Sequence, residues 1–225
     1  MTEVTPHSEC PFQPKTFELL EKFTNSSNKD FYLEHKEKFQ EYIEKPLHKI
    51  YKYVVAQLEG EIIKKLSIKT NEVPKTTKNG CEYELYHQSS SNRIDARLFI
   101  NIAPTEFRFG LFIPKNSHDK PRFIKNTQNS KVKEIILQNT HIINDCTFHY
   151  SSITTIKKIN FLADWLRLLA RQNSATKNIQ VSMHIKQNEI FYFSMEEIVI
   201  KIKKVLESVY ILFLAATCDD LNCGS

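Results

Sequence analysis

Few residue patterns in this 225-residue sequence have the spacing that catalysis requires. No glycine-rich loop can cradle a nucleotide phosphate, because the four glycines lie far apart, at Gly60, Gly80, Gly110 and Gly224. The GxSxG motif of serine hydrolases and the HExxH motif of zinc enzymes do not occur, and the eight histidines lack metal-ligand spacing. We therefore expect a non-enzymatic protein that needs neither a metal nor a small-molecule cofactor.

Carboxylates offer one catalytic alternative, a small metal-dependent nuclease or hydrolase. Asp95, placed on a predicted strand, follows Glu82 and Glu84 in the sequence. Clustered carboxylates hold the divalent cation in such enzymes. The Glu-x-Lys element that usually completes a nuclease core does not follow Asp95, so this alternative ranks below a binding function.

The densest positive charge lies between residues 108 and 133, where seven basic residues accompany a single acid, Asp119. This segment is either a solvated loop leading into a helix at residues 131–138 or an electrostatic footprint for nucleic acid phosphates. Nearby amides can bond to phosphates or base edges. The basic residues are Arg108, Lys115, Lys120, Arg122, Lys125, Lys131 and Lys133.

A second candidate surface belongs to residues 93–114, which read RIDARLFINIAPTEFRFGLFIP. Apolar residues alternate along two arms around a proline-containing connection, which predicts a β-hairpin with one buried face. The other face is either solvated beneath a helix or a contact surface. The candidate nucleic-acid-binding residues from both segments are Arg97, Phe99, Arg108, Phe112, Lys115, Lys120, Arg122 and Lys125.

Helical periodicity predicts the elements that frame these surfaces. Helices are expected at residues 12–23, 29–58, 156–170 and 195–216, with a kink or break at residues 44–46 because Pro46 removes a backbone donor. Ser194 and Glu197 form a capping box for the last helix. Trp165 is interpreted as an aromatic at the edge of the core rather than a base-stacking platform.

Alternating patterns predict further strands at residues 81–87, 147–153 and 179–186, with a loop at residues 67–79. The predicted fold is α+β: a mainly antiparallel sheet, a meander with a central hairpin, packed by N-terminal and C-terminal helices. We expect one domain over residues 1–225. It comprises a flexible N-terminus (1–11), a helical layer (12–66), a sheet with inserted helices (81–193), a closing helix (194–217) and a tail (218–225).

Composition is that of an ordinary globular protein, with 41% hydrophobic and 25% charged residues and a net charge of +5. Five cysteines without a CxxC pair, and an N-terminus without an apolar signal segment, predict a cytoplasmic protein without a disulfide framework. The apolar run at residues 209–216 is too short to span a bilayer, so no membrane association is expected.

Three stretches together resemble the N-terminal domain of bacterial McrB-like AAA+ ATPases of restriction systems. They are residues 12–54, from FQPKTFELLEKF to HKIYKYV; residues 96–113, ARLFINIAPTEFRFGLFI; and residues 194–220, SMEEIVIKIKKVLESVYILFLAATCDD. The resemblance implies an opening helix pair, a sheet hairpin and a closing helix ahead of a motor domain. The sequence ends at Ser225, where that motor would begin, so we expect an isolated recognition module, a truncated relative or a domain that acts in trans.

The function that the resemblance implies is recognition of DNA, including modified DNA, in a defence system, with an AAA+ ATPase or a nuclease subunit as a further partner. The alternative from another class is a protein-protein interaction domain that acts in trans with such an ATPase. Salt separates the two, because DNA binding weakens steeply as counterions compete whereas protein binding depends on salt only weakly.

Overall fold

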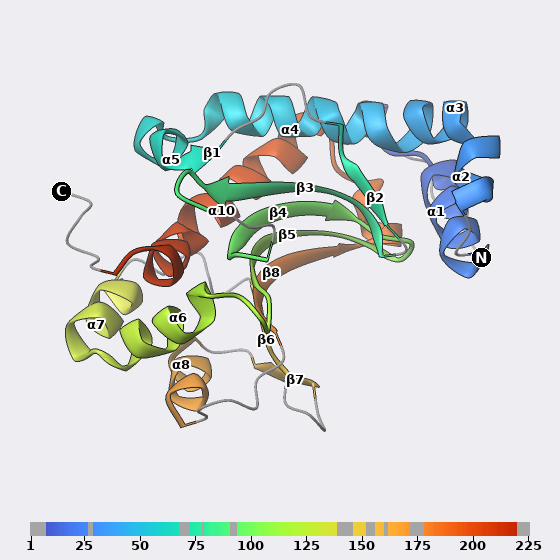
Figure 1. Ribbon diagram of the computed structural model, residues 1–225. Helices are drawn as coiled ribbons and strands as arrows, with labels where there is room; N and C mark the ends of the chain where they lie inside the picture. The colour runs from blue at the N-terminus through green and yellow to red at the C-terminus, as the bar shows by residue number, and fades with distance from the viewer. Residues whose placement is uncertain are drawn as a thin grey trace.

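The computed structural model describes residues 8–26, 29–67, 73–77, 79–90, 94–138, 146–151, 156–159, 162–171 and 178–219. All of its strand pairings are antiparallel, and the strands form one curved sheet in the order β1-β3-β4-β5-β8-β6-β7, with β2 also paired to β3 (Figure 1). The α+β prediction is confirmed. The strands are β1 (Leu66–Ser67), β2 (Lys75–Thr77), β3 (Gly80–His87), β4 (Arg97–Ile102), β5 (Glu106–Ile113), β6 (Thr147–Ser151), β7 (Ile156–Ile159) and β8 (Ile179–Lys186).

The predicted hairpin forms β4 and β5 at the centre of this sheet. Side chains alternate between the two faces of a strand, so the apolar set of each strand points to one side, which we call the core face. Burying one such side chain fully stabilises the fold by about 1.5–3 kcal/mol. The buried hairpin residues on the core face are Leu98, Ile100, Ile102, Phe107, Phe109, Leu111 and Ile113.

Helix α10 (Met195–Thr217) packs against the core face and contacts β5, β4 and β8. It begins as predicted, because the Ser194 hydroxyl accepts a hydrogen bond from the Glu197 amide at 3.2 Å and the Glu197 carboxylate accepts one from the Ser194 amide at 2.8 Å. These two bonds satisfy donors that a helix start leaves without intrahelical partners. In Figure 1, α10 runs behind the sheet and ends beside α6 and α7.

The N-terminal helical layer is more interrupted than its periodicity predicts. It consists of α1 (Pro14–Ser26), α2 (Lys29–Glu34), α3 (Lys36–Phe39), a π-helix (Gln40–Glu44) and α4 (Lys45–Gln57). At residues 44–46, where a kink or break was predicted, the π-helix ends at Glu44 and α4 follows directly at Lys45, and the backbone of both residues stays helical. Proline lacks the amide that would bond to the Tyr42 carbonyl, and the Thr16 hydroxyl donates to that carbonyl instead, at 2.8 Å.

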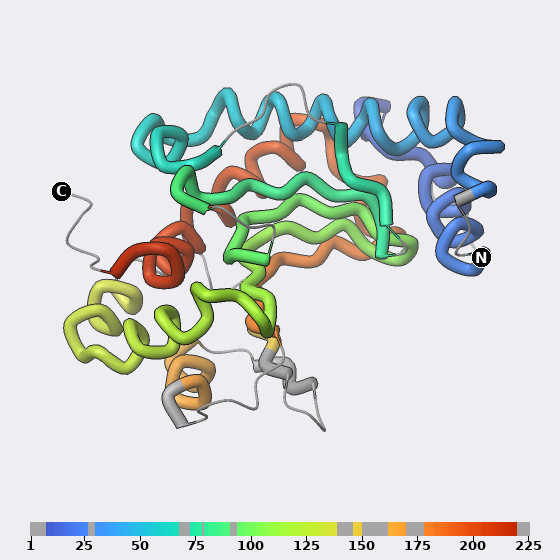
Figure 2. The backbone as a smooth tube through the Cα atoms, in the orientation of Figure 1, coloured from blue at the N-terminus to red at the C-terminus, as the bar shows by residue number. Residues whose placement is uncertain are grey.

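The remaining helices are α5 (Gly60–Lys65), α6 (Asp119–Gln128), α7 (Ser130–Gln138), α8 (Leu162–Arg171) and α9 (Gln187–Ile190). Figure 2 shows α6, α7 and α8 gathered at one end of the molecule, next to the end of α10. Helix α6 contacts α10, α7 and α8 and therefore joins this group. None of the helices in the described ranges combines the length and the apolar character that a bilayer span requires.

Three segments differ from the predictions. Lys75–Thr77 is a strand rather than a loop, because the chain turns at Asn79 and pairs this segment with the start of β3, and three residues are too few to show a period. Ile156–Ile159 is also a strand, paired with β6, and the predicted helix begins only at Leu162. Residues 119–128 form α6 instead of a solvated loop; several polar side chains on this helix are buried, so its sequence lacks an apolar period.

Trp165 is fully buried on α8, between Phe148 and Phe123, which confirms its interpretation as a core aromatic. Ala163 on the same helix is exposed, because it lies off the buried stripe formed by Leu162, Trp165 and Leu169. Most of the predicted flexible N-terminus and tail, and the start of the predicted hairpin at Arg93, lie outside the described residues.

Candidate nucleic-acid interface

The second face of the sheet, which we call the outer sheet face, carries four of the eight predicted site residues. Arg97 lies directly opposite Phe112 across β4 and β5, and its guanidinium stacks over the Phe112 ring at 4.6 Å. Arg97 Nε also pairs with Glu84 Oε1 on β3 at 2.8 Å. The Tyr86 hydroxyl donates to the other oxygen of Glu84 at 3.0 Å. Arg97 is therefore held by a carboxylate and an aromatic ring of its own sheet.

Arg108 is held in a similar way. Its Nε donates to Asn101 Oδ1 at 2.9 Å, and its Nη1 lies 3.6 Å from Glu106 Oε1. Phe99 is 4% exposed and lies opposite Gly110. These side chains surround a cavity of about 130 Å³, lined by Asn79, Glu82, Arg97, Phe99, Arg108, Phe112 and Gln180.

Charge on the outer sheet face is close to balanced. The two arginines stand beside Glu82, Glu84 and Glu106, and two of these carboxylates pair directly with a guanidinium. Burial raises the pKa of Glu82, and the neighbouring Glu84 carboxylate adds to that effect. A phosphate approaching this face would meet carboxylates as well as guanidiniums, so its attraction by the arginines is largely offset.

A chain of hydrogen bonds crosses the same face from β8 to β5. The Gln180 amide donates to Ser182 Oγ at 2.8 Å, Ser182 Oγ is 2.8 Å from His184 Nε2, and His184 Nδ1 is 2.9 Å from Glu106 Oε2. The hydrogen bond from His184 lowers the pKa of Glu106. The connectivity is that of a serine-histidine-carboxylate relay, but Ser182 is fully buried and offers no exposed nucleophile.

No sequence pattern predicted this series of hydrogen bonds. Alternation along residues 179–186 places Gln180, Ser182 and His184 on one face, but Glu106 lies 78 residues away from His184. Only the pairing of β5 with β8 brings the carboxylate to the histidine.

Three other predicted site residues converge at a different place. Lys115, Lys120 and Lys125 line a cavity of about 540 Å³ between the segment after β5 and one side of α6. We call this cavity the lysine pocket. Among the residues that the structure describes, its lining is Lys115, Asn116, Ser117, Lys120, Pro121, Ile124, Lys125 and Gln128, and none of these is a carboxylate.

Backbone bonds fix the shape of the lysine pocket. The Ser117 amide donates to the Pro114 carbonyl at 3.1 Å, and the Ser117 hydroxyl accepts from the Asp119 amide at 3.0 Å, so a tight turn leads into α6. The Lys115 amide donates to Asn178 Oδ1 at 2.9 Å, which ties the same segment to the start of β8. On α6, the spacing of Lys120, Ile124 and Gln128 by four residues places them along one side of the helix.

Lys120 is the least exposed of the three lysines. It is 7% exposed, whereas Lys115 and Lys125 are exposed. Burial lowers the pKa of the Lys120 amine, because removing an ammonium from water disfavours its charged form.

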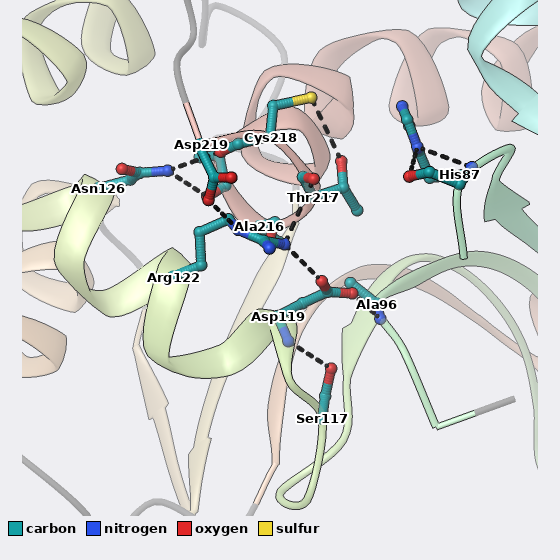
Figure 3. Close-up of polar contacts among 12 residues, drawn as sticks. His87, Ala96, Ser117, Asp119, Arg122, Asn126, Ala216, Thr217, Cys218 and Asp219 are labelled. Carbon is teal, nitrogen blue, oxygen red and sulfur yellow. Dashed lines mark hydrogen bonds and ion pairs between the residues drawn. The ribbon is translucent and has the colours of Figure 1, made fainter. Parts of the chain in front are cut away.

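Arg122, the eighth predicted residue, lies apart from the lysine pocket lining and faces the end of α10 (Figure 3). Its Nη1 donates to Asp119 Oδ1 at 2.9 Å and to the Ala216 and Thr217 carbonyls at 3.2 and 3.3 Å. Its Nε donates to Asp219 at 2.7 Å. Asn126 adds hydrogen bonds to the Ala215 and Cys218 carbonyls. The last carbonyls of a helix lack intrahelical partners, so α6 caps α10.

Asp119 connects this cap to the hairpin. One oxygen binds Arg122, and the other accepts from the Ala96 amide, just before β4, at 2.8 Å. Burial raises the pKa of Asp119, and the hydrogen bond from Ala96 opposes that effect. The single acid of the basic segment is thus a structural anchor.

The carboxylates considered for a nuclease do not form one site. Asp95 precedes β4 rather than lying on a strand, which corrects its predicted position, and it is buried near Asp119. Glu82 and Glu84 lie on the outer sheet face. Within the described ranges, no group of three or more histidine, cysteine or acidic side chains is arranged to hold a metal ion.

Comparison with known proteins adds no relative to these observations. No family model matches the chain, and no curated protein sequence matches it closely enough to be counted as a relative.

Proposed function

We propose that this chain is a non-enzymatic recognition module that binds DNA, with the lysine pocket as its main phosphate contact. The observation that carries the proposal is the convergence of three lysines on one cavity, with no carboxylate among the described residues of its lining. Positive charge without a neighbouring carboxylate attracts phosphates and releases their counterions on binding. The amides of Asn116 and Gln128 in the same lining can bond to phosphate oxygens or base edges.

The outer sheet face is the less favourable of the two predicted surfaces for phosphates, because its arginines already pair with carboxylates. We assign it a secondary role, in which Phe112 and the stacked Arg97 contact bases or sugars once the lysine pocket holds the backbone.

The biological setting of the proposal comes from the resemblance to McrB-like N-terminal domains, which implies recognition of DNA, including modified DNA, for a partner ATPase or nuclease in a defence system. A cytoplasmic location is part of this proposal. The four cysteines among the described residues are free thiols, which suits a reducing compartment.

Fluorescence anisotropy with labelled single- and double-stranded DNA across a salt series tests the proposal. For duplex DNA, the logarithm of affinity falls with the logarithm of salt concentration by about 0.9 per phosphate contact, so replacing Lys115 and Lys125 by Gln should flatten that slope by about 2. The matched control replaces Lys45 and Lys52, two exposed lysines on α4, and should leave the slope nearly unchanged.

Absence of binding to every DNA at low salt would overturn the proposal for this chain. Salt-insensitive capture of a protein partner would then favour the alternative, an interaction domain that acts in trans. Equal loss of slope in the α4 control would show that the attraction is a property of overall charge and not of the lysine pocket.

A further inference from the structure

We infer that the cavity on the outer sheet face binds one unpaired guanine base of a nucleic acid strand. This inference rests on the proposed function and specifies which base its secondary surface recognises.

Two rows of side chains frame this cavity, each made of direct neighbours across the strands. One row is Glu82, Asn101 and Arg108 on β3, β4 and β5, and the other is Arg97, Phe112 and Gln180 on β4, β5 and β8. Phe99 lies between the rows on β4 and is almost fully buried. Neighbouring strands are about 4.7–4.9 Å apart, so the backbones at Glu82 and Arg108 are separated by roughly 10 Å. A flat group that lies across the sheet can therefore contact both side chains.

Glu82 supplies an acceptor that the fold leaves unused. Its carboxylate is partly buried, and Arg97, Lys75 and Arg108 act on it through charge, without a hydrogen bond or an ion pair from any residue in the described ranges. A partly buried carboxylate has lost some of the water that would satisfy its oxygens. A ligand with two adjacent N–H donors would replace that water, because a carboxylate accepts on both oxygens.

The arginines and Asn101 supply donors. Arg97 uses Nε for Glu84, and Arg108 uses Nε for Asn101 and Nη1 for Glu106. A guanidinium has five N–H donors, so these contacts engage only part of each set. Asn101 Nδ2 is buried without a hydrogen-bond partner in the described part of the chain. Donor capacity therefore remains beside the Glu82 acceptor.

Guanine is the base whose bonding groups match this arrangement. Its N1–H and N2 amine are adjacent donors, and its O6 and N7 are adjacent acceptors. A carboxylate can accept from both donors while a guanidinium donates to both acceptors. Each of the other bases offers a single donor group to a carboxylate. In a base pair, cytosine already occupies N1–H and the N2 amine, so the guanine must be unpaired.

The size of the cavity limits the ligand to one base. Its volume of about 130 Å³ is well below the roughly 300–1,000 Å³ of pockets that enclose a whole small organic ligand, so the sugar and phosphate stay outside. Phe112 is partly exposed and carries the Arg97 guanidinium stacked at 4.6 Å. Unpaired bases stack on aromatic rings and on guanidinium planes.

The lysine pocket lies within reach of the same strand. Lys115 follows Phe112 by three residues, which places their Cα atoms at most about 11 Å apart. One nucleic acid strand can therefore place a phosphate at Lys115 and a nearby base in the cavity.

Fluorescence anisotropy with short labelled oligothymidine strands tests the inference. Four strands differ only in one central base, which is guanine, hypoxanthine, 7-deazaguanine or adenine. We expect the guanine strand to bind about tenfold more tightly than the adenine strand, within the range of one bidentate base contact. Hypoxanthine lacks the N2 amine and 7-deazaguanine lacks the N7 acceptor, so both should lose most of this preference. In duplexes with their complements, the guanine and adenine strands should bind equally.

Glu82→Gln keeps the size of the side chain but replaces one acceptor oxygen by a donor amide. It should abolish the preference for guanine and leave the salt-sensitive binding through the lysine pocket. A melting curve shows whether this variant folds, and the hypoxanthine strand tests the same contact on the unchanged chain. Glu37→Gln, the same substitution at an exposed position on α3, is the matched control and should keep the preference.

The outcomes separate this inference from the proposed function. Equal, salt-sensitive binding of all four strands leaves the proposed function intact and overturns the inference. Isothermal titration with guanosine monophosphate shows whether a free nucleotide is the source, and its binding without binding of any strand overturns the nucleic acid source and the proposed function together. A preference for guanine that survives in Glu82→Gln, or that the hypoxanthine strand keeps in full, contradicts the assignment to this cavity.

Discussion

Replacing Arg122 by Met should destabilise the fold without weakening the contact with nucleic acid. The guanidinium joins α6 to the end of α10 through Asp119 and the Ala216 and Thr217 carbonyls (Figure 3). Methionine keeps much of the apolar stem and removes all of these donors. The two elements lie 94 residues apart in sequence, so this contact bridges distant parts of the chain.

The magnitude follows from the exposure of each partner. A hydrogen bond involving a charged group contributes about 1.5–3 kcal/mol. The Arg122 side chain is 31% exposed, which places each bond at the lower end of that range. Asp219 is 90% exposed and adds little. The Nη1 nitrogen has two hydrogens for three acceptors, so we count two effective bonds and expect a loss of about 3 kcal/mol.

Urea unfolding followed by circular dichroism measures this loss. For a chain of this size, 3 kcal/mol corresponds to a fall in Tm of roughly 6–12 °C. The matched control is Lys125→Gln, an exposed residue on the same helix, which should change stability by less than about 0.5 kcal/mol. In DNA binding the roles reverse: Arg122→Met should keep the salt slope, and Lys125→Gln should reduce it by about 0.9. Unchanged stability in Arg122→Met together with a flatter salt slope would refute the capping role.

Three further predictions concern the sheet and the closing helix. Ser194→Ala removes the N-cap of α10 and should cost about 1 kcal/mol in urea unfolding, with a loss below about 0.3 kcal/mol counting against the cap. Gly110→Ala would place a Cβ 2.1 Å from the Val181 carbonyl oxygen at a φ of +154°, so a cost of about 3 kcal/mol or more is expected, and wild-type melting would contradict it. The pKa of Glu106 is lowered in the folded chain, so Glu106 adds stability above its unfolded pKa, about 4.3, and that stability disappears as pH falls through the folded value. Glu106→Gln should therefore have a lower free energy of unfolding than wild type at pH 7, and that free energy should fall less on acidification. Parallel curves of unfolding free energy against pH for the two proteins would refute the role of the His184 bond.

Sequence patterns predicted the secondary-structure elements that depend on residues close together in the sequence. The hairpin follows from period-two alternation, and the start of α10 follows from Ser194 and Glu197, three residues apart. Helix α6 was missed because its stability comes from distant partners. Asn126 bonds to carbonyls at the end of α10, and Asp119 bonds to the amide of Ala96, and neither contact leaves an apolar period in the sequence.

The candidate site was predicted as a set of residue types but not as an arrangement. The sequence prediction grouped Arg97, Arg108 and Arg122 with the lysines, because a sequence shows basic residues and not their partners. Each arginine pairs with a carboxylate from another part of the fold or from its own element. Glu84 on β3 pairs with Arg97, Glu106 at the start of β5 pairs with Arg108, and Asp119 and Asp219 pair with Arg122. Only tertiary structure shows that these three guanidiniums are paired with carboxylates.

The measurement that tests the central claim most directly is the salt dependence of duplex DNA binding by the wild-type chain and by the Lys115→Gln, Lys125→Gln double variant. Binding through the lysine pocket predicts a steep slope for the wild type that falls by about 2 in the variant, while the α4 control keeps the wild-type slope. A slope that is the same in all three proteins, or no binding at low salt, would contradict the claim.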